Sequence, residues 1–295
     1  MFFYSTRSFL IIFVFFSFLF SSCKEKTNTK ENDCLILKAD LNKSVVMPLD
    51  RLFEKIELIP LETTENSLIS NLSYVKYVYS DNKHYILDIS QAILFIFNQD
   101  GSYHNHIDKK GLGPGEYTLI YDFLINPQKR QIEMLSPYKY IYCYDFDGNF
   151  IKLLDFSFID APNIQRVNIL DDENYIVWSD NYTDKDCISI ISQNTGELVN
   201  SFWQDHMLFN LWAGNVFYHY NNETYFCLRL YNNVYKVTKD GFDAVYEWNL
   251  GDKTLDISQH KLATTMENVN RDRDNMLKLL EDKILPYEFS RHNRR

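Results

Sequence analysis

The sequence predicts an all-β fold, a β-propeller of four-stranded blades, on the strength of three observations. Four similar segments each place a glycine at a short turn between two β-rich runs, and these glycines recur at intervals of 47, 48 and 45 residues. A further β-rich run, such as HYILDI or QIEMLS, precedes each hairpin, and another strand candidate, such as YVKYVYS, precedes that run. A period of this length with about four strands per unit is typical of a propeller blade. The turn glycines are Gly101, Gly148, Gly196 and Gly241.

The composition favours a folded, strand-rich protein. Of the 295 residues, 45% are hydrophobic and 16% are aromatic, including 22 Phe and 21 Tyr. This content argues against disorder, and aromatic side chains suit the half-buried surface of a pleated sheet. The formal net charge of -10 argues against a broad nucleic-acid surface, because a phosphate backbone requires clustered Lys and Arg. We therefore expect no nucleic-acid partner.

The stretch KKGLGPGEY, residues 109–117, is rich in glycine, as phosphate-binding loops are. A P-loop requires Lys and then Ser or Thr after its last glycine, whereas here Glu116 and Tyr117 follow. A dinucleotide fingerprint requires G-x-G-x-x-G ahead of a helix, whereas G-x-G-x-G here precedes the strand-like TLIYDFLINP. We therefore expect no cofactor, and we interpret the glycines as crossings between blades. The crossing glycines are Gly111, Gly113, Gly115 and Gly251.

The N-terminus carries an export signal. Arg7 precedes the apolar run Phe9–Phe20, which is shorter than the roughly 20 residues of a membrane span and suits a signal-peptide core. Two serines and Cys23 follow, so residues 1–22 resemble a bacterial lipoprotein signal, with Phe20 where such signals usually carry Leu. The resemblance implies that Cys23 is acylated and that residues 23–33 form a flexible tether to the outer membrane, on its periplasmic or surface side. The alternative is an ordinary secretory peptide with a chance cysteine.

Cysteine and histidine spacing gives no clear metal site. Cys143, Cys187 and Cys227 lie in strand-like apolar runs, and the sequence has no C-x-x-C. An exported chain with an even number of cysteines besides Cys23 could form disulfides, but we expect buried free thiols rather than disulfides or zinc ligands. His104 and His106 alternate on the expected outermost strand of the first blade. They are weak candidates for a metal, because no third ligand is visible and a solvated edge strand explains them as well.

The stretch from GLGPGEY through DFDGNFIKLL combines a glycine-rich loop, an aromatic residue, strands and an Asp-Gly hairpin. This order resembles an NHL-type repeat. With LFEKIELIPLETTENSLIS near the start, the chain resembles more narrowly the six-bladed β-propeller lipoproteins common in bacteroidetes, over roughly residues 35–285. The resemblance implies an anchored, exported propeller of unsettled biochemical role, and it supplies no catalytic residues.

The visible blades occupy residues 34–255, after which residues 256–295 take a helical pattern. Members of the resembled family resume with further blades after such a segment, so we expect an incomplete propeller from a truncated or frame-shifted reading frame or a fragment. The alternative is a genuine smaller propeller. Because an incomplete ring leaves a sheet edge open, we expect a monomer unless that edge pairs. The apolar residues that indicate the helix are Met276, Leu279, Leu280 and Ile284.

Two functional classes remain. The first is a non-catalytic binding or scaffold protein of the cell envelope, held by its lipid, with an unknown protein or glycan as ligand. The alternative is an NHL-like propeller enzyme, a lyase or hydrolase, that uses the central channel. Glu116 and Tyr117 are weak candidates for contact with a partner at a blade rim. A row of tyrosines with a period of two suits either stacking on sugar rings or, preferably, packing between blades. The row is Tyr138, Tyr140, Tyr142 and Tyr144.

Overall fold

The computed structural model describes residues 34–256 except 44–45, 47, 162, 181–185, 205–214 and 229–230, together with residues 278, 280 and 283. The predicted signal peptide, Cys23, the tether and most of the predicted helical segment 256–295 therefore lie outside the described residues. Among the described residues, no helix is long and apolar enough to cross a membrane.

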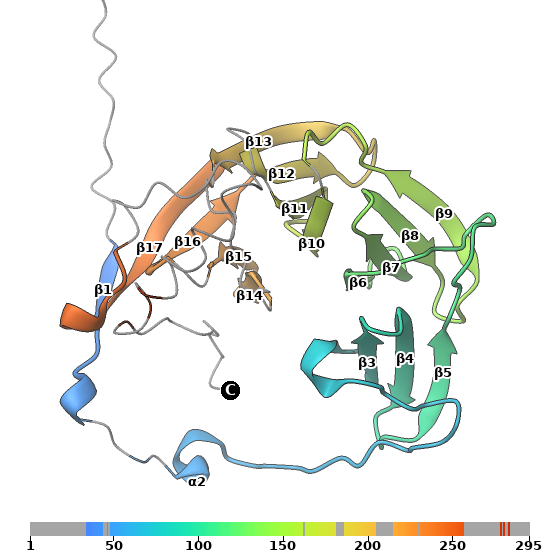
Figure 1. The fold of residues 1–295 in the computed structure, drawn as a ribbon, viewed down its shortest axis with the longest axis horizontal. Coiled ribbons are helices and arrows are strands. Elements are labelled where there is room, and N and C mark those ends of the chain that lie inside the picture. Colours follow the sequence, from blue (N-terminus) through green and yellow to red (C-terminus); the bar gives the residue numbers. More distant parts are fainter. Residues whose placement is uncertain are drawn as a thin grey trace, which may run out of the picture. The chain divides into compact units, whose positions relative to one another are not determined.

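The prediction of an all-β propeller is confirmed, because four blades of four antiparallel strands each follow one another in chain order (Figure 1). In blade 1 the strands are β2 (Val75–Ser80), β3 (Lys83–Asp88), β4 (Ile93–Asn98) and β5 (Tyr103–Ile107), and in blade 2 they are β6 (Asp122–Asn126), β7 (Gln131–Ser136), β8 (Tyr140–Tyr144) and β9 (Phe150–Asp155). Blade 3 contains β10 (Asn163–Ile169), β11 (Asn174–Asp180), β12 (Asp186–Ser192) and β13 (Leu198–Gln204), and blade 4 contains β14 (Phe217–Tyr220), β15 (Glu223–Phe226), β16 (Asn233–Thr238) and β17 (Gly241–Asn249).

Short helical turns flank the blades. They are η1 (Leu41–Lys43) and α2 (Leu49–Leu52), then η2 (Leu72–Tyr74) directly before β2, and η3 (Gly251–Lys253) after β17. The predicted crossing glycine Gly251 lies at the start of η3 with a φ of 64°.

Turn chemistry sets the ends of the strands. Gly101, Gly148 and Gly196 lie between the third and fourth strands of blades 1, 2 and 3, and Gly241 begins the fourth strand of blade 4. The first three have φ values of 86°, 83° and 75°, a region that side chains other than glycine enter at a cost. The turns between the first and second strands of blades 1 and 4 use Asp-Asn and Asn-Asn pairs, both with positive φ, as a two-residue hairpin requires. These pairs are Asp81–Asn82 and Asn221–Asn222.

A fifth strand extends the sheet of blade 4. Strand β1 (Leu35–Lys38) pairs in parallel with β17, from Leu35 opposite Tyr246 to Lys38 opposite Asn249. The order of this sheet is therefore β1-β17-β16-β15-β14. The repeat pattern did not predict this pairing, because it joins the two ends of the described region and no local turn indicates it.

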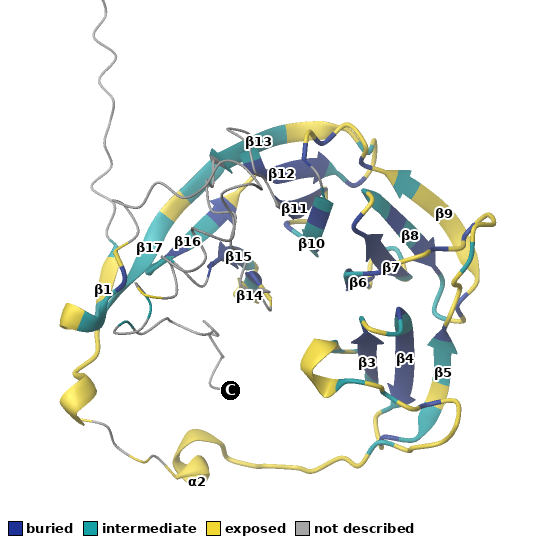
Figure 2. Cartoon of the chain, viewed as in Figure 1, coloured by how far each residue is buried: buried dark blue, intermediate teal, exposed yellow. Residues whose placement is uncertain are grey.

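Hydrophobic clusters join each blade to the next. The middle strands are the most buried and outer strand β9 is largely exposed (Figure 2). Each large side chain buried in this way stabilises the fold by roughly 1.5–3 kcal/mol. Residues that share a cluster across two blades include Leu94 with Phe123, Leu135 with Val177, and Ile176 with Phe226.

A polar cluster also lies between blades 2 and 3. The carboxyl group of Glu133 is fully buried, and its Oε1 accepts a hydrogen bond of 3.1 Å from Asn126 Nδ2, which also donates to Gln193 Oε1 at 3.1 Å. Burial raises the pKa of Glu133, and Tyr175, Lys129 and Asn126 partly offset that rise. A raised pKa means that the folded protein binds this proton more tightly than the unfolded chain does.

The stability of the protein should therefore depend on pH through Glu133. Its stabilising contribution is complete below the unfolded pKa of about 4.5 and is lost as the pH rises through the higher folded pKa. Glu133→Gln removes this titration, so at pH 8 we expect the variant to exceed the wild type in free energy of unfolding by about 1–3 kcal/mol. At pH 4 the advantage should vanish. Urea denaturation at both pH values measures this difference, and a difference that does not change with pH would contradict the prediction.

Candidate functional site

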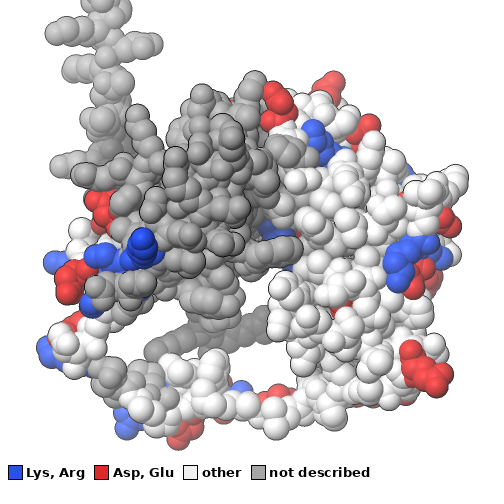
Figure 3. Space-filling view, viewed as in Figure 1, with Lys and Arg blue, Asp and Glu red and all other residues white. Residues whose placement is uncertain are grey.

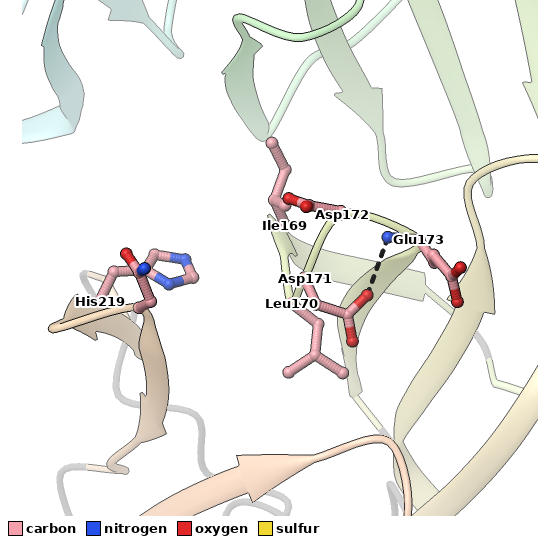
Figure 4. A pocket seen from close by; sticks show the side chains of 7 residues that line it. Ile169, Leu170, Asp171, Asp172, Glu173 and His219 are labelled. Carbon is pink, nitrogen blue, oxygen red and sulfur yellow. Dashed lines mark hydrogen bonds between the residues drawn. The ribbon is translucent and has the colours of Figure 1, made fainter.

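Two hollows are the candidates for a functional site. The first, here called the inner pocket, has a volume of about 610 Å³ and lies where the turn between β10 and β11 faces the end of β14 (Figure 4). Residues 169–173, His219 and Asn222 line it. The second, here called the tyrosine groove, has a volume of about 590 Å³. Residues 111–116 and 118 form one side of it, and Tyr138, Tyr140, Tyr142, Phe150 and Leu153 form the other.

The acidic side chains of the inner pocket largely stabilise local structure. Asp171 Oδ1 accepts hydrogen bonds from the backbone N–H of Glu173 at 2.9 Å and from Asn174 Nδ2 at 2.8 Å. Asp172 Oδ1 accepts a hydrogen bond of 2.6 Å from Gln128 Nε2 of blade 2. Among the residues that the structure describes, no group of three His, Cys, Asp or Glu side chains is arranged to hold a metal ion. The carboxylates thus close a turn and join two blades.

His219 lies across the inner pocket from these carboxylates (Figure 4). Its Nδ1 is 3.1 Å from Thr224 Oγ1, which donates to the carbonyl oxygen of Leu170 at 3.1 Å. With the hydroxyl proton committed to Leu170, Nδ1 carries its own proton and donates to Thr224. Desolvation lowers the pKa of His219, although its side chain is exposed at the pocket.

The connector that forms one side of the tyrosine groove is folded back on itself. Glu116 Oε2 accepts a hydrogen bond of 2.8 Å from the backbone N–H of Gly113. A Cβ atom at Gly111 would lie 1.9 Å from the same Oε2, so only glycine leaves room for this contact. Gly111 and Gly113 therefore make space for the carboxylate of their own loop, and a role of Glu116 in contacting a partner stays a prediction.

Tyr117 fixes the connector to blade 1. Its side chain is 1% exposed, and its hydroxyl lies 3.0 Å from the carbonyl oxygen of Ala92 and 3.1 Å from that of Ile107. The same hydroxyl accepts a hydrogen bond of 3.3 Å from the backbone N–H of Lys109. Burial raises the pKa of Tyr117. The structure thus buries the side chain of Tyr117, so this residue can influence the binding of a partner only indirectly, by holding the connector in place.

Phe150 and Tyr144 hold the connector in place at Gly115. A Cβ atom at Gly115 would lie 2.4 Å from Cγ of Phe150, so the aromatic ring rests directly on the glycine backbone. The Tyr144 hydroxyl donates a hydrogen bond of 2.8 Å to the carbonyl oxygen of Gly115, and its ring meets that of Phe150 edge to face at 5.9 Å. Gly115 has a φ of 75°. These contacts fix the connector against β8 and β9.

The other tyrosines of the predicted row remain accessible. Tyr138, in the turn before β8, is 55% exposed, and Tyr140 and Tyr142 on β8 are half-buried. The Tyr142 ring packs edge to face on Tyr117 at 5.7 Å. Among the described residues, none of these three hydroxyl groups has a hydrogen-bond partner. The row is therefore divided, because Tyr144 belongs to the core and the rest line the tyrosine groove.

His104 and His106 lie on β5, which is the outermost strand of blade 1 as predicted. A β-bulge interrupts the alternation, so Ile96 faces Asn105 and Phe97 faces Tyr103. Tyr103 consequently contacts His106, with its hydroxyl 2.6 Å from Nδ1. His104 is exposed. Among the described residues no third metal-ligating side chain joins them.

Charge and thiols add no further site. Acidic and basic side chains lie in small groups of both signs on the visible face (Figure 3). Cys143, Cys187 and Cys227 are free and buried, as the sequence predicts, and Cys34 is free and partly exposed. Burial raises the pKa of the Cys143 thiol to about 12, which suppresses its reactivity.

Comparisons with known proteins find similarity to solved structures. No curated protein matches the chain. A structure of a protein from Bacteroides fragilis described as exported is similar, with a TM-score of 0.55 and 19% identity, over 66% of this chain and 56% of that one. A member of the DUF4221 family from Bacteroides vulgatus gives a TM-score of 0.47 and 11% identity, over 66% and 63%. The chain thus spans just over half the length of the exported protein.

The sequence itself matches one family, described as a domain of unknown function (DUF4934), over residues 34–287. This match covers all four blades. The chain belongs to the DUF4934 family.

Proposed function

We propose that the protein is a lipid-anchored, non-catalytic binding protein of the cell envelope, and that the tyrosine groove is where it binds its ligand. The propeller fold and the similarity to an exported protein support an exported binding or scaffold protein. The observation that carries the assignment to the groove is its set of accessible aromatic rings beside polar groups without partners. Ligand sites typically combine an apolar, aromatic lining with a few polar groups that fix orientation.

The inner pocket supports the alternative function, an enzyme, less well than the tyrosine groove supports a binding protein. Its Asp171 and Asp172 side chains are held by local hydrogen bonds. Because Nδ1 of His219 donates to Thr224, Nε2 of this imidazole is the atom that could accept a proton. General acid–base catalysis needs a titratable group within hydrogen-bond reach of the proton that it transfers. A lyase or hydrolase active at this pocket would require His219, so retention of any such activity by His219→Gln would remove the inner pocket from consideration.

Tyrosine nitration tests the groove without any assumption about the chemical class of its ligand. We expect an envelope fraction that contains the ligand to slow the nitration of Tyr138 and Tyr140 by tetranitromethane, measured by mass spectrometry of peptides. Tyr79 of blade 1, which is 46% exposed, serves as the matched control and should react at an unchanged rate. Equal rates for all three tyrosines with and without the fraction would contradict a ligand in the groove.

The lipid anchor gives a separate prediction. Cys23→Ala removes the thiol that would be acylated, so we expect the variant to move from the membrane pellet to the soluble fraction on ultracentrifugation and immunoblotting. Cys34→Ala removes the other N-terminal thiol and should leave the protein in the pellet. Retention of Cys23→Ala in the pellet would refute the anchor.

A further inference from the structure

We infer that the tyrosine groove takes a neutral glycan chain, by stacking of sugar rings on Tyr138, Tyr140 and Tyr142 and by hydrogen bonds from sugar hydroxyls. This inference rests on the proposed function and names its ligand class. It follows from the geometry of the rings, the unpaired polar groups and the charge of the lining.

The rings form a short platform. Tyr140 and Tyr142 lie on the same face of β8, where alternate residues are about 7 Å apart. Tyr138 extends the row from the preceding turn, with more than half of its surface exposed. Lys139, between the first two tyrosines, points elsewhere, since its Nζ donates to the carbonyl oxygen of Ile159 at 2.8 Å. Three half-exposed rings in sequence suit a ligand with flat apolar faces that repeat along a chain.

Polar groups border this platform. The hydroxyl groups of the three tyrosines and of Thr118 have no hydrogen-bond partner among the described residues, and neither does Glu116 Oε1, because the contact of this carboxylate with Gly113 uses Oε2. Hydroxyl groups both donate and accept, and a carboxylate accepts. A sugar ring has an apolar face with hydroxyl groups around its rim, so it can cover the rings and satisfy these groups together.

The charge of the lining selects against anions. Glu116 is the sole charged side chain among the residues that line the groove. A phosphate, sulfate or uronate group would meet this carboxylate without a Lys or Arg to balance it. The lining therefore favours a neutral chain over an acidic one.

A proline-rich peptide, the other common occupant of aromatic grooves, fits the polar border less well. Consecutive prolines have neither hydroxyl groups nor backbone N–H groups, so they cannot donate hydrogen bonds to Glu116 or to the tyrosine hydroxyl groups.

Calorimetric titration of the purified protein tests the inference. The probes are cello-, laminari-, manno- and xylohexaose, with hexagalacturonate as the acidic probe and decaproline as the peptide probe. We expect at least one neutral hexaose to bind with a Kd on the order of 1 mM or below. Tyr140→Ala should weaken that binding about tenfold, whereas Tyr140→Phe, which keeps the ring, should weaken it about two- to threefold.

Two further variants keep the test decisive. Tyr138→Ala changes an exposed turn residue that the core does not need, so this variant should fold normally. We expect it also to bind the hexaose more weakly, which tests the platform even if Tyr140→Ala fails to fold. Tyr79→Ala removes an exposed tyrosine outside the groove and should leave affinity unchanged. Binding of none of the neutral hexaoses, or binding that Tyr138→Ala and Tyr140→Ala leave unchanged, overturns the inference. Binding of decaproline alone overturns the glycan as the ligand but leaves the groove as a binding site. Protection of Tyr138 from nitration would likewise support the groove as a binding site, whichever ligand it binds.

Discussion

Asp122→Ala should lower the free energy of unfolding by about 3–5 kcal/mol, because it removes one partner of a buried ion pair. Asp122, on β6, is 1% exposed, and its Oδ1 lies 2.5 Å from Nζ of Lys76 on β2. Its Oδ2 accepts a hydrogen bond of 2.9 Å from the backbone N–H of Val167 on β10. One carboxylate thus connects the first strands of three blades, and alanine leaves the charge of Lys76 without a counterion and the buried N–H of Val167 without an acceptor.

Urea denaturation of wild type and variant measures this effect. The matched control is Glu57→Ala, which breaks the exposed pair of Lys55 and Glu57 and should leave the denaturation midpoint unchanged. A midpoint for Asp122→Ala equal to that of Glu57→Ala would contradict a structural role for the buried pair.

A double variant separates the pair from simple loss of packing. Lys76 also donates to the carbonyl oxygen of Phe123 at 2.8 Å, and its side chain is 21% exposed. If the unpaired lysine accounts for much of the loss, Lys76→Met in the Asp122→Ala background should recover part of the stability, because it removes the unbalanced charge. If Lys76→Met instead adds a further loss to that of Asp122→Ala, the ion pair is not the source of the effect.

Local sequence patterns predicted the blades but not the contacts between them. A glycine turn and two β-rich runs lie within about 15 residues, so one window of sequence contains the whole hairpin. The contact of Lys76 with Asp122 joins residues that are 46 positions apart in the chain. Nothing in the sequence around either residue distinguishes it from an ordinary exposed charge. The pairing of β1 with β17 is still less local. Such contacts arise only once the blades pack.

The candidate site was predicted only in part, because its geometry also depends on contacts between residues far apart in the sequence. The period of two identified the tyrosine row, but which rings stay accessible depends on the connector that Tyr117 and Tyr144 hold in place. Glu116 was identified by its place in the loop, whereas its bond to Gly113 depends on the conformation of the connector. At β5 a single β-bulge places Tyr103 beside His106, and the sequence alone contains no clear signal for that bulge.

Gly101→Ala should destabilise the protein by about 3 kcal/mol or more. Gly101 has a φ of 86°, which costs an alanine about 1–2 kcal/mol. A Cβ atom there would also lie 2.1 Å from the carbonyl oxygen of Pro60, and overpacking of this kind adds typically 1–3 kcal/mol. The backbone of this segment is held in place, since the N–H of Glu62 donates to the carbonyl oxygen of Gly101 at 2.9 Å.

Gly196→Ala separates the two costs, because Gly196 has a φ of 75° and a Cβ atom there would meet no atom within 4 Å. We expect this control to lose only about 1–2 kcal/mol, so the gap between the two variants in urea denaturation measures the contact with Pro60. Hydrogen exchange adds a local readout, since the amide of Glu62 should exchange faster in Gly101→Ala but not in Gly196→Ala. Equal losses in both variants would mean that the segment preceding blade 1 yields to the added methyl group, and that backbone conformation alone explains why glycine is needed at this turn.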